Sequence, residues 1–270
     1  MTRPYAEVIG DPISHSKSPL IHGFWLKALG IEADYRATHV TPDALPDFIA
    51  RRREDPAWRG CNVTLPHKIA VMDQVDDPGN VRASIGAMNT VARDEAGQIF
   101  GTNTDAGGFY GPIAELPLAG APVVVAGTGG AAHAVLFALS RMDIGPVTLL
   151  ARNPLKGTAL LARFGLKGDV RAMDADLPPA QLLVNTTSLG MVGQPAFAPD
   201  LSPLPADAVV YDIVYAPLVT PLLAAAEARD LQTVDGLEML VGQAAIAFEL
   251  FFGAAPPRDR DSELRELLTA

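Results

Sequence analysis

The 270-residue sequence contains little cysteine and no long run of like charges. Cys61 is its one cysteine, which excludes an internal disulfide and is typical of a protein of a reducing compartment. No base near Cys61 would activate it, so we interpret it as a buried strand residue rather than a nucleophile. The one basic run, residues 51–53, is followed directly by Glu54 and Asp55. Without clustered lysine and arginine, no nucleic-acid partner is expected.

Long apolar runs are missing as well. The N-terminus lacks the apolar segment of a signal peptide. Residues 244–255 are interrupted by Glu249 and fall short of the roughly 20 residues that cross a bilayer. We therefore expect a soluble, cytoplasmic protein with no membrane segment. The histidines form no ligand cluster, so no metal is expected. Hydrophobic residues make up 49% of the chain, enough for one large domain or two ordinary ones.

Strand and helix patterns alternate along the chain, which predicts an α/β fold with a largely parallel sheet. Residues 5–9 form the first predicted strand. A helix follows with Ser18 at the N-cap, Pro19 in the first turn and Gly30 past the end. Further strands are predicted at 123–126, 147–151, 182–185 and 209–212, and closing helices at 237–252 and 262–268. We place the domain change near residue 103, and composition leaves open which half the closing helices contact.

A glycine-rich loop joins the apolar strand at 123–126 to an Ala- and Leu-rich helix. Residues 127–132 fit G-x-G-x-x-G/A in the strand–loop–helix context that a dinucleotide-binding loop requires. Such glycines make a tight turn and let backbone N–H groups approach a pyrophosphate at the positive end of the helix. A structural turn without ligand is the alternative. We predict that Gly127, Gly129, Gly130 and Ala131 bind a dinucleotide.

The end of the next strand indicates which dinucleotide is bound. An NAD site usually has a carboxylate there, whereas this chain has Ala151-Arg152-Asn153, with Lys156 one turn further on. Arginine and lysine suit a 2′-phosphate through charge and bidentate hydrogen bonds. We therefore predict NADP, held by Arg152 and Lys156. An ordinary solvated arginine at a helix start is the alternative.

The first half carries polar clusters at the expected ends of its strands, at residues 14–18, 62–68, 88–90 and 102–105. Ligands of open α/β sheets bind at the carboxyl ends of strands, and amides and hydroxyls suit a small ligand with several hydroxyl groups. Ser16 and Ser18, before a helix start, would suit a carboxylate. Turn and cap chemistry could explain any one cluster. Four clusters in one half favour a ligand site.

Lys68 follows Pro66 and is predicted to lie in the first turn of a helix, where the helix dipole disfavours a positive charge. A structural role for it there is therefore poorly supported, and we predict a role in proton transfer. Asp105 is the best candidate for a carboxylate partner. The sequence does not show that the two side chains meet.

Taken together and in this order, the motifs resemble those of shikimate dehydrogenases over nearly the whole chain. The matching segments are residues 14–19, 62–68, 89–90, 103–105, 127–132 and 185–190, then Tyr215 and residues 235–243. The resemblance implies a two-domain α/β protein. Its parts would be a substrate-binding domain over 1–103, a Rossmann NADP-binding domain over 104–235, and C-terminal helices over 236–270 that return to the substrate domain.

The resemblance also implies the activity, a reversible NADPH-dependent reduction of 3-dehydroshikimate to shikimate on the route to aromatic amino acids. The implied catalytic pair is Lys68 and Asp105. The implied substrate residues are Ser16, Ser18 and Tyr215 at the carboxylate, and Thr64, Asn89, Asp105 and Gln243 at the ring hydroxyls. Near the cofactor, the resemblance adds Thr187, Gly236 and Met239. The oligomeric state, monomer or homodimer, stays open.

Two alternatives remain on the same scaffold. One is a quinate/shikimate dehydrogenase of broader substrate and cofactor use. The family often has Asn-Arg-Thr where this chain has Ala151-Arg152-Asn153, which leaves room for NAD. The other is a non-catalytic ligand sensor. A sensor should have lost Lys68 or Asp105, and this chain keeps both.

Overall fold

The structure is a computed structural model that describes residues 3–270. The chain divides into two compact units. Unit 1 comprises the chain through Asp105 together with Val241–Ala270, and unit 2 comprises Ala106–Leu240. Within the described residues, no helix is both long enough and apolar enough to span a membrane.

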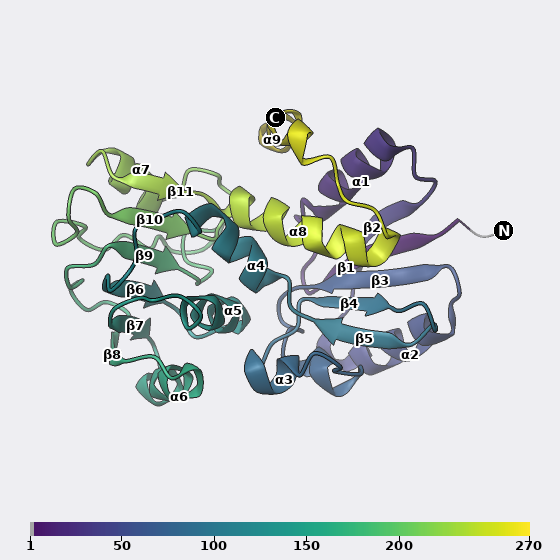
Figure 1. Cartoon of the computed structure of the whole chain (residues 1–270), viewed down its shortest axis with the longest axis horizontal. Helices are drawn as coiled ribbons and strands as arrows, with labels where there is room; N and C mark the ends of the chain where they lie inside the picture. The colour runs from purple at the N-terminus through teal and green to yellow at the C-terminus, as the bar shows by residue number, and fades with distance from the viewer. Residues whose placement is uncertain (1–2) are drawn as a thin grey trace. The chain divides into compact units, whose positions relative to one another are not determined.

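Unit 1 is built on a mixed sheet with the strand order β2-β1-β3-β4-β5 (Figure 1). Its strands are β1 (Tyr5–Gly10), β2 (Asp34–His39), β3 (Trp58–Val63), β4 (Thr90–Arg93) and β5 (Ile99–Thr102). β1 runs parallel to β2 and β3, whereas β4 runs antiparallel to β3 and β5. The carboxyl ends of β1, β3 and β5 therefore share one edge of the sheet with the start of β4.

The helices of unit 1 begin with α1 (Ser18–Leu29), which ends at Gly30 in the left-handed conformation (φ 64°), as predicted. The N-cap prediction is wrong by one residue, because Lys17 caps α1 and its carbonyl accepts from the backbone of Leu20 and Ile21. The unit also contains η1 (Pro42–Ala44), α2 (Leu45–Glu54), η2 (Ala70–Asp73), α3 (Val81–Ser84), η4 (Arg258–Arg260) and α9 (Asp261–Thr269).

The long helix α8 (Gly236–Phe252) enters unit 1 at Val241. Its Phe251 is buried with Ala6 of β1 and Ala92 of β4. Gly60 of β3 makes this packing possible, since a Cβ there would stand 2.5 Å from the Phe251 ring. Composition did not decide where the closing helices go, and the structure places residues 241–270 in the first unit.

Unit 2 is built on a parallel sheet with the strand order β11-β10-β9-β6-β7-β8 (Figure 1). Its strands are β6 (Val123–Ala126), β7 (Val147–Ala151), β8 (Gly168–Ala172), β9 (Leu182–Asn185), β10 (Val209–Asp212) and β11 (Gln232–Val234). The connecting helices are α4 (Asp105–Tyr110), η3 (Gly111–Ile113), α5 (Gly130–Leu139), α6 (Pro154–Phe164) and α7 (Pro221–Glu227). The four strands predicted here are confirmed.

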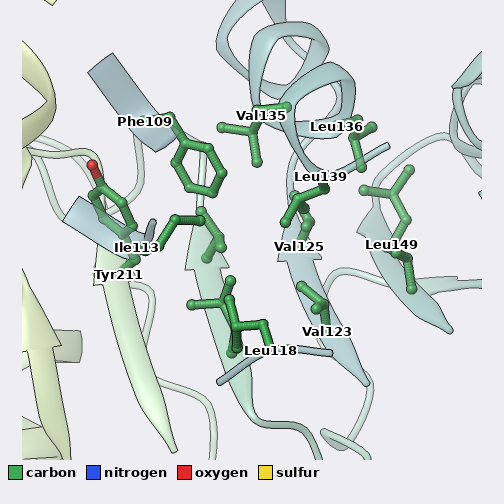
Figure 2. Close-up of a cluster of buried hydrophobic side chains, with 14 of the residues drawn as sticks. Phe109, Ile113, Leu118, Val123, Val125, Val135, Leu136, Leu139, Leu149 and Tyr211 are labelled. Atoms are coloured by element: carbon green, nitrogen blue, oxygen red, sulfur yellow. The ribbon is translucent and has the colours of Figure 1, made fainter. Parts of the chain in front are cut away.

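One apolar cluster packs α5 against this sheet (Figure 2). Val135 and Leu139 of α5 are fully buried in the same cluster as Val125 of β6. Beside them the rings of Phe109 and Tyr211 stack with centroids 5.1 Å apart. Each such side chain stabilises the fold by about 1.5–3 kcal/mol on burial. This packing holds the loop between β6 and α5 in place.

Candidate active site

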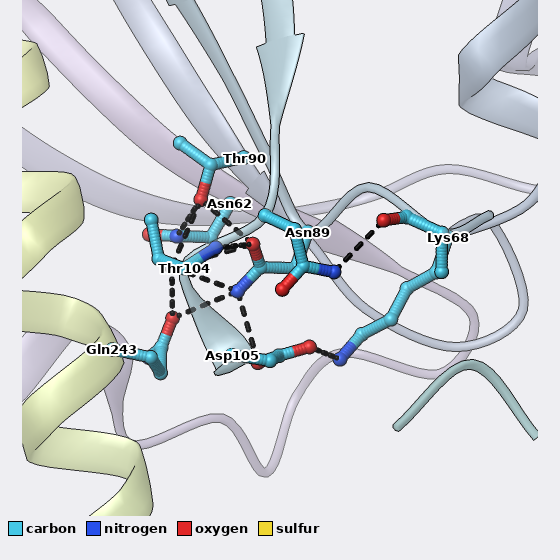
Figure 3. Close-up of polar contacts among 9 residues, drawn as sticks. Asn62, Lys68, Asn89, Thr90, Thr104, Asp105 and Gln243 are labelled. Carbon is cyan, nitrogen blue, oxygen red and sulfur yellow. Dashed lines mark hydrogen bonds and ion pairs between the residues drawn. The ribbon is translucent and has the colours of Figure 1, made fainter. Parts of the chain in front are cut away.

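The polar clusters of unit 1 meet at the sheet edge described above (Figure 3). Lys68 follows β3, Asn89 immediately precedes β4, and Asp105 lies three residues beyond β5. Asn89 and Asp105 are 2% and 5% exposed, so the cluster is nearly closed to water. All three residues were predicted to lie at strand ends. Asn89 instead precedes its strand, and it reaches the same edge because β4 is antiparallel.

Lys68 and Asp105 form a direct ion pair. The distance from Lys68 Nζ to Asp105 Oδ2 is 2.5 Å, and the two side chains are 14% and 7% exposed. A charge-assisted hydrogen bond in a nearly water-free site is stronger than the same contact at the surface. The pair therefore holds an ammonium group at a fixed position, from which it can give a proton to a bound ligand.

The local structure around Lys68 differs from the prediction. Residues 66–69 form turns that lead into the short 3₁₀ helix η2, so no α-helix begins at Pro66. The Lys68 carbonyl accepts a hydrogen bond from Met88 N at 2.7 Å, which anchors the backbone to a distant segment. The helix-dipole argument for Lys68 is therefore wrong. Its position depends on the ion pair and on this long-range bond.

Neutral amides surround the carboxylate. Asn89 Nδ2 donates to Asp105 Oδ1 at 2.9 Å and lies 3.2 Å from Gln243 Oε1 of α8. Asn89 Oδ1 accepts from the backbone N–H of Thr104 at 2.7 Å, which fixes the orientation of the amide. The structure thus brings together Lys68, Asp105, Asn89 and Gln243, residues from segments far apart in the sequence.

Of the residues predicted at the substrate carboxylate, Ser16 and Ser18 lie after β1 in unit 1, and Tyr215 belongs to unit 2. Ser18 is 4% exposed, and its backbone N–H donates to the Ser16 hydroxyl at 3.3 Å. Thr64 follows β3 and donates its backbone N–H to Ile9 at 3.0 Å. Gly10 lets Thr64 approach the end of β1, since a Cβ there would stand 2.6 Å from Thr64 Cγ2. These hydroxyls belong to the strand ends that also hold the Lys68–Asp105 pair.

Sequence reasoning assigned no role to several residues that the structure places in the cluster. Asn62 and Thr90 are 5% and 0% exposed and hydrogen-bond each other at 3.2 Å. Thr104 contacts Asn89, and the Tyr35 hydroxyl donates to Asn62 at 2.6 Å. Three of these residues stood within the quoted motifs. Their pairing comes from the strand register, which the sequence did not predict.

The glycine loop of unit 2 lies at the carboxyl end of β6. A Cβ on Gly127 (φ 111°) would stand 2.6 Å from Thr186 Oγ1, so this turn requires glycine. Gly129 is exposed, stands at the N-cap of α5 and offers no side chain, which leaves the first N–H groups of that helix to a ligand or water. Ala132 is fully buried, which gives close packing of helix and strand. This donor set fits a pyrophosphate.

The side chains after β7 fit a 2′-phosphate. Arg152 and Lys156 are both exposed, and Asn153 caps α6 by accepting from Lys156 N at 3.2 Å. The Asn153 side chain is therefore engaged in capping α6. Arg152 directly precedes this N-cap and Lys156 lies in the first turn of α6, so both cations flank the helix start, an arrangement that suits a dianionic phosphate.

The loop after β9 is held by its own polar groups. Asn185 Oδ1 accepts from both the backbone N–H and the hydroxyl of Thr187, at 3.0 and 2.7 Å. Asn185 Nδ2 donates to Asp212 at 2.9 Å, and the Thr220 hydroxyl donates to the same carboxylate at 2.7 Å. Burial raises the pKa of Asp212 above its usual range. The Thr187 hydroxyl is therefore engaged within the loop.

The remaining predicted residues of unit 2 have clear structural settings. A Cβ on Gly236 would stand 2.4 Å from the Ile213 carbonyl oxygen, so glycine lets the start of α8 approach the end of β10. Met239 is 6% exposed and belongs to the core cluster. Burial raises the pKa of the Tyr215 phenol. Among residues 3–270 no group of three or more His, Cys, Asp or Glu side chains could hold a metal ion.

The fold and these two residue sets define an oxidoreductase that uses a nicotinamide dinucleotide. Two family models match the chain, the shikimate dehydrogenase substrate binding domain over residues 8–91 and the shikimate 5'-dehydrogenase C-terminal domain over residues 236–261. The chain belongs to the shikimate dehydrogenase family. A shikimate dehydrogenase (NADP(+)) of Sphingopyxis alaskensis is 68% identical to it over 267 residues, which cover 99% of this chain and 97% of that relative.

Solved structures are similar over the whole chain as well. Shikimate 5-dehydrogenase of Thermus thermophilus, in complex with NADP(H) and shikimate, has a TM-score of 0.84 and 36% identity. That alignment covers 98% of this chain and 99% of the other. Quinate dehydrogenase of Corynebacterium glutamicum, in complex with NAD, also has a TM-score of 0.84, with 30% identity over 98% of this chain and 99% of the other. The backbone alone therefore does not separate the two specificities.

Proposed function

We propose that this chain catalyses the reversible NADPH-dependent reduction of 3-dehydroshikimate to shikimate, a step toward aromatic amino acids. The observation that carries the proposal is the buried Lys68–Asp105 pair, whose Nζ–Oδ2 distance is 2.5 Å. Beside it stand the neutral amides of Asn89 and Gln243. One proton donor among neutral hydrogen-bonding groups suits a cyclic ligand with a carbonyl and several hydroxyls.

The cofactor part of the proposal rests on unit 2. The bare N-terminus of α5 at Gly129 suits the pyrophosphate, and the exposed Arg152 and Lys156 suit a 2′-phosphate. When bound, NADP supplies or accepts the hydride, and the protein supplies binding, orientation and charge.

Lys68 has the role of the proton donor. During reduction, negative charge develops on the former carbonyl oxygen, and the Lys68 ammonium protonates it. Asp105 keeps that ammonium in place through Oδ2, while Asn89 occupies one position on Oδ1. Each carboxylate oxygen can accept more than one hydrogen bond, so Asp105 can also accept from a substrate hydroxyl.

The substrate carboxylate is assigned to Ser16 and Ser18, with Thr64, Asn89 and Gln243 at the ring hydroxyls. Support comes from the position of Ser16, Ser18 and Thr64 at the ends of β1 and β3, the edge that also carries the Lys68–Asp105 pair. We assign Tyr215 to the carboxylate as well, on the resemblance alone.

Initial rates at 340 nm test the proposal, with shikimate and quinate each paired with NADP⁺ and NAD⁺. Activity confined to shikimate and NADP⁺ is the expected result. Turnover of quinate, or equal use of NAD⁺, would instead make the protein an enzyme of broader specificity. If no pairing gives turnover while calorimetry detects shikimate binding, the protein is a sensor and the proposal is wrong.

A further inference from the structure

A run of four hydrogen bonds connects Tyr35 of β2 to the carboxylate of Asp105, and Figure 3 shows the last three, which are buried. The Tyr35 hydroxyl donates to Asn62 Oδ1 at 2.6 Å, and Asn62 Nδ2 donates to Thr90 Oγ1 at 3.2 Å. The Thr90 hydroxyl then donates to Asn89 Oδ1 at 3.2 Å, and Asn89 Nδ2 donates to Asp105 Oδ1 at 2.9 Å. Every donor along this run points toward Asp105.

The first member of the run is fixed by aromatic packing. The Tyr35 ring stacks on His22, with centroids 3.9 Å apart and an angle of 1° between the planes. Burial raises the pKa of the Tyr35 phenol, and the neighbouring Ser18 side chain opposes that rise. The run therefore begins beside a serine that we assign to the substrate carboxylate, and it ends at the partner of Lys68.

The middle of the run is set by the sheet itself. Asn62 of β3 and Thr90 of β4 are directly opposed partners in the antiparallel ladder. Cross-strand partners project to the same face, so the backbone register brings the two side chains together. Thr90 has one hydroxyl, which accepts from Asn62 and can donate to Asn89, and it thereby joins the two amides.

The orientation of the Asn89 amide determines whether its nitrogen or its oxygen faces the Asp105 carboxylate. Its oxygen accepts from the Thr104 backbone at 2.7 Å and from the Thr90 hydroxyl at 3.2 Å, so its nitrogen faces the carboxylate. With Oδ1 of Asp105 occupied by that nitrogen, Oδ2 is directed at Lys68. Aligned hydrogen bonds in a buried site strengthen one another, and a broken link leaves an unsatisfied buried group.

We propose that Asn62 and Thr90 are positioning residues of the reaction, a role that rests on the function proposed above. They hold the Asn89 amide in the orientation that aligns the Asp105 carboxylate with Lys68. Within the described residues, neither has a hydrogen bond to Lys68 or Asp105, so both act through Asn89.

Thr90→Val tests the proposal, because valine keeps the shape of threonine and removes the hydroxyl. We expect kcat for shikimate oxidation to fall about tenfold, with KM for NADP⁺ unchanged within about twofold. Thr90→Ser restores the hydroxyl and should recover kcat to within about threefold of wild type. Thr148→Val is the matched control, since Thr148 is also buried and bonded to a carboxylate, that of Asp169 at 2.8 Å. Its kcat should match wild type.

The primary deuterium isotope effect separates positioning from a loss of folded protein. With shikimate deuterated at the carbinol carbon that loses hydride, a misaligned proton-transfer pair slows the chemical step and raises the isotope effect on kcat. Fewer folded molecules would lower kcat and leave the isotope effect at its wild-type value. If Thr90→Val does not fold, Asn62→Ala removes the donor to Thr90 and should give the same two changes.

The two proposals fail in different ways. Wild-type protein that does not oxidise shikimate with NADP⁺ would overturn the proposed function. Active wild-type protein, with a Thr90→Val variant whose kcat and isotope effect equal those of wild type, would overturn the positioning role. A lower kcat with an unchanged isotope effect would also overturn it.

Discussion

Replacing His22 with leucine should make unit 1 less sensitive to acid. His22 is fully buried among Trp25, Tyr35 and Phe248, and within the described residues neither of its ring nitrogens has a hydrogen-bond partner. Burial lowers the pKa of His22 from 6.5 to about 3, because the apolar surroundings disfavour the charged ring. The imidazole is therefore neutral in the folded protein at all but strongly acidic pH.

The sign of the effect follows from where the proton binds. Between pH 6.5 and about 3 the unfolded chain protonates this histidine and the folded chain does not, so acid favours unfolding. The contribution of His22 to stability is fully present above its unfolded pKa and is lost as the pH falls. For a folded pKa well below 5, the loss between pH 7 and pH 5 amounts to about 2 kcal/mol.

Urea unfolding at pH 7 and pH 5, followed by tryptophan fluorescence, measures this loss. Trp25 and Trp58 both belong to unit 1, so the signal reports the unit that contains His22. Wild type should lose about 2 kcal/mol more than His22→Leu between the two pH values. Loss of ring packing lowers the stability of the variant at both pH values and cancels in that difference. His15→Leu, at an exposed histidine, should keep the wild-type difference. Equal losses in wild type and His22→Leu would refute the reasoning.

Three further substitutions test the two sites. Lys68→Ala should lower kcat by about 10² while KM for shikimate stays within about tenfold, and near-normal turnover would remove Lys68 from the mechanism. Arg152→Ala should raise KM for NADP⁺ about tenfold and leave KM for NAD⁺ within about twofold, and equal effects on both would contradict the 2′-phosphate role. The raised pKa of Asp212 means that its stabilising contribution is present below the unfolded pKa of 3.8 and is lost as the pH rises. The Tm of Asp212→Asn relative to wild type should therefore increase from pH 4 to pH 7 in calorimetry, and a constant difference would contradict this.

The sequence predicted the parallel sheet of unit 2 well, because its central strands are short, mostly apolar runs. The runs at 123–126 and 182–185 have this form, and the structure shows all four residues of each buried. Strands buried on both faces are mostly apolar, which makes them recognisable from local sequence. In unit 1, β4 and β5 were not predicted as separate elements.

Local sequence could not predict what the strand register brings together. Asn62 and Thr90 are 28 positions apart, and their contact exists because β3 and β4 pair antiparallel. The prediction of a helix at Lys68 is wrong for a related reason. The Lys68 carbonyl accepts a hydrogen bond from Met88 N, and no local sequence pattern predicts this contact. The motifs named most of the residues that the structure brings together in unit 1, while their mutual geometry is a property of the sheet.

The charge arrangement of unit 1 explains why turnover, more than binding, should depend on Lys68. Asp105 has one cationic partner among the described residues, Lys68, and its other contact is the neutral amide of Asn89. A second cation beside Asp105 could take the place of Lys68 both as its partner and as a proton donor. Asn89 is neutral and cannot do so. Loss of Lys68 therefore removes the proton donor, and Asp105 keeps its contact with the Asn89 amide. The hydroxyls and amides that would bind the ring are untouched, so affinity should change little while the chemical step slows.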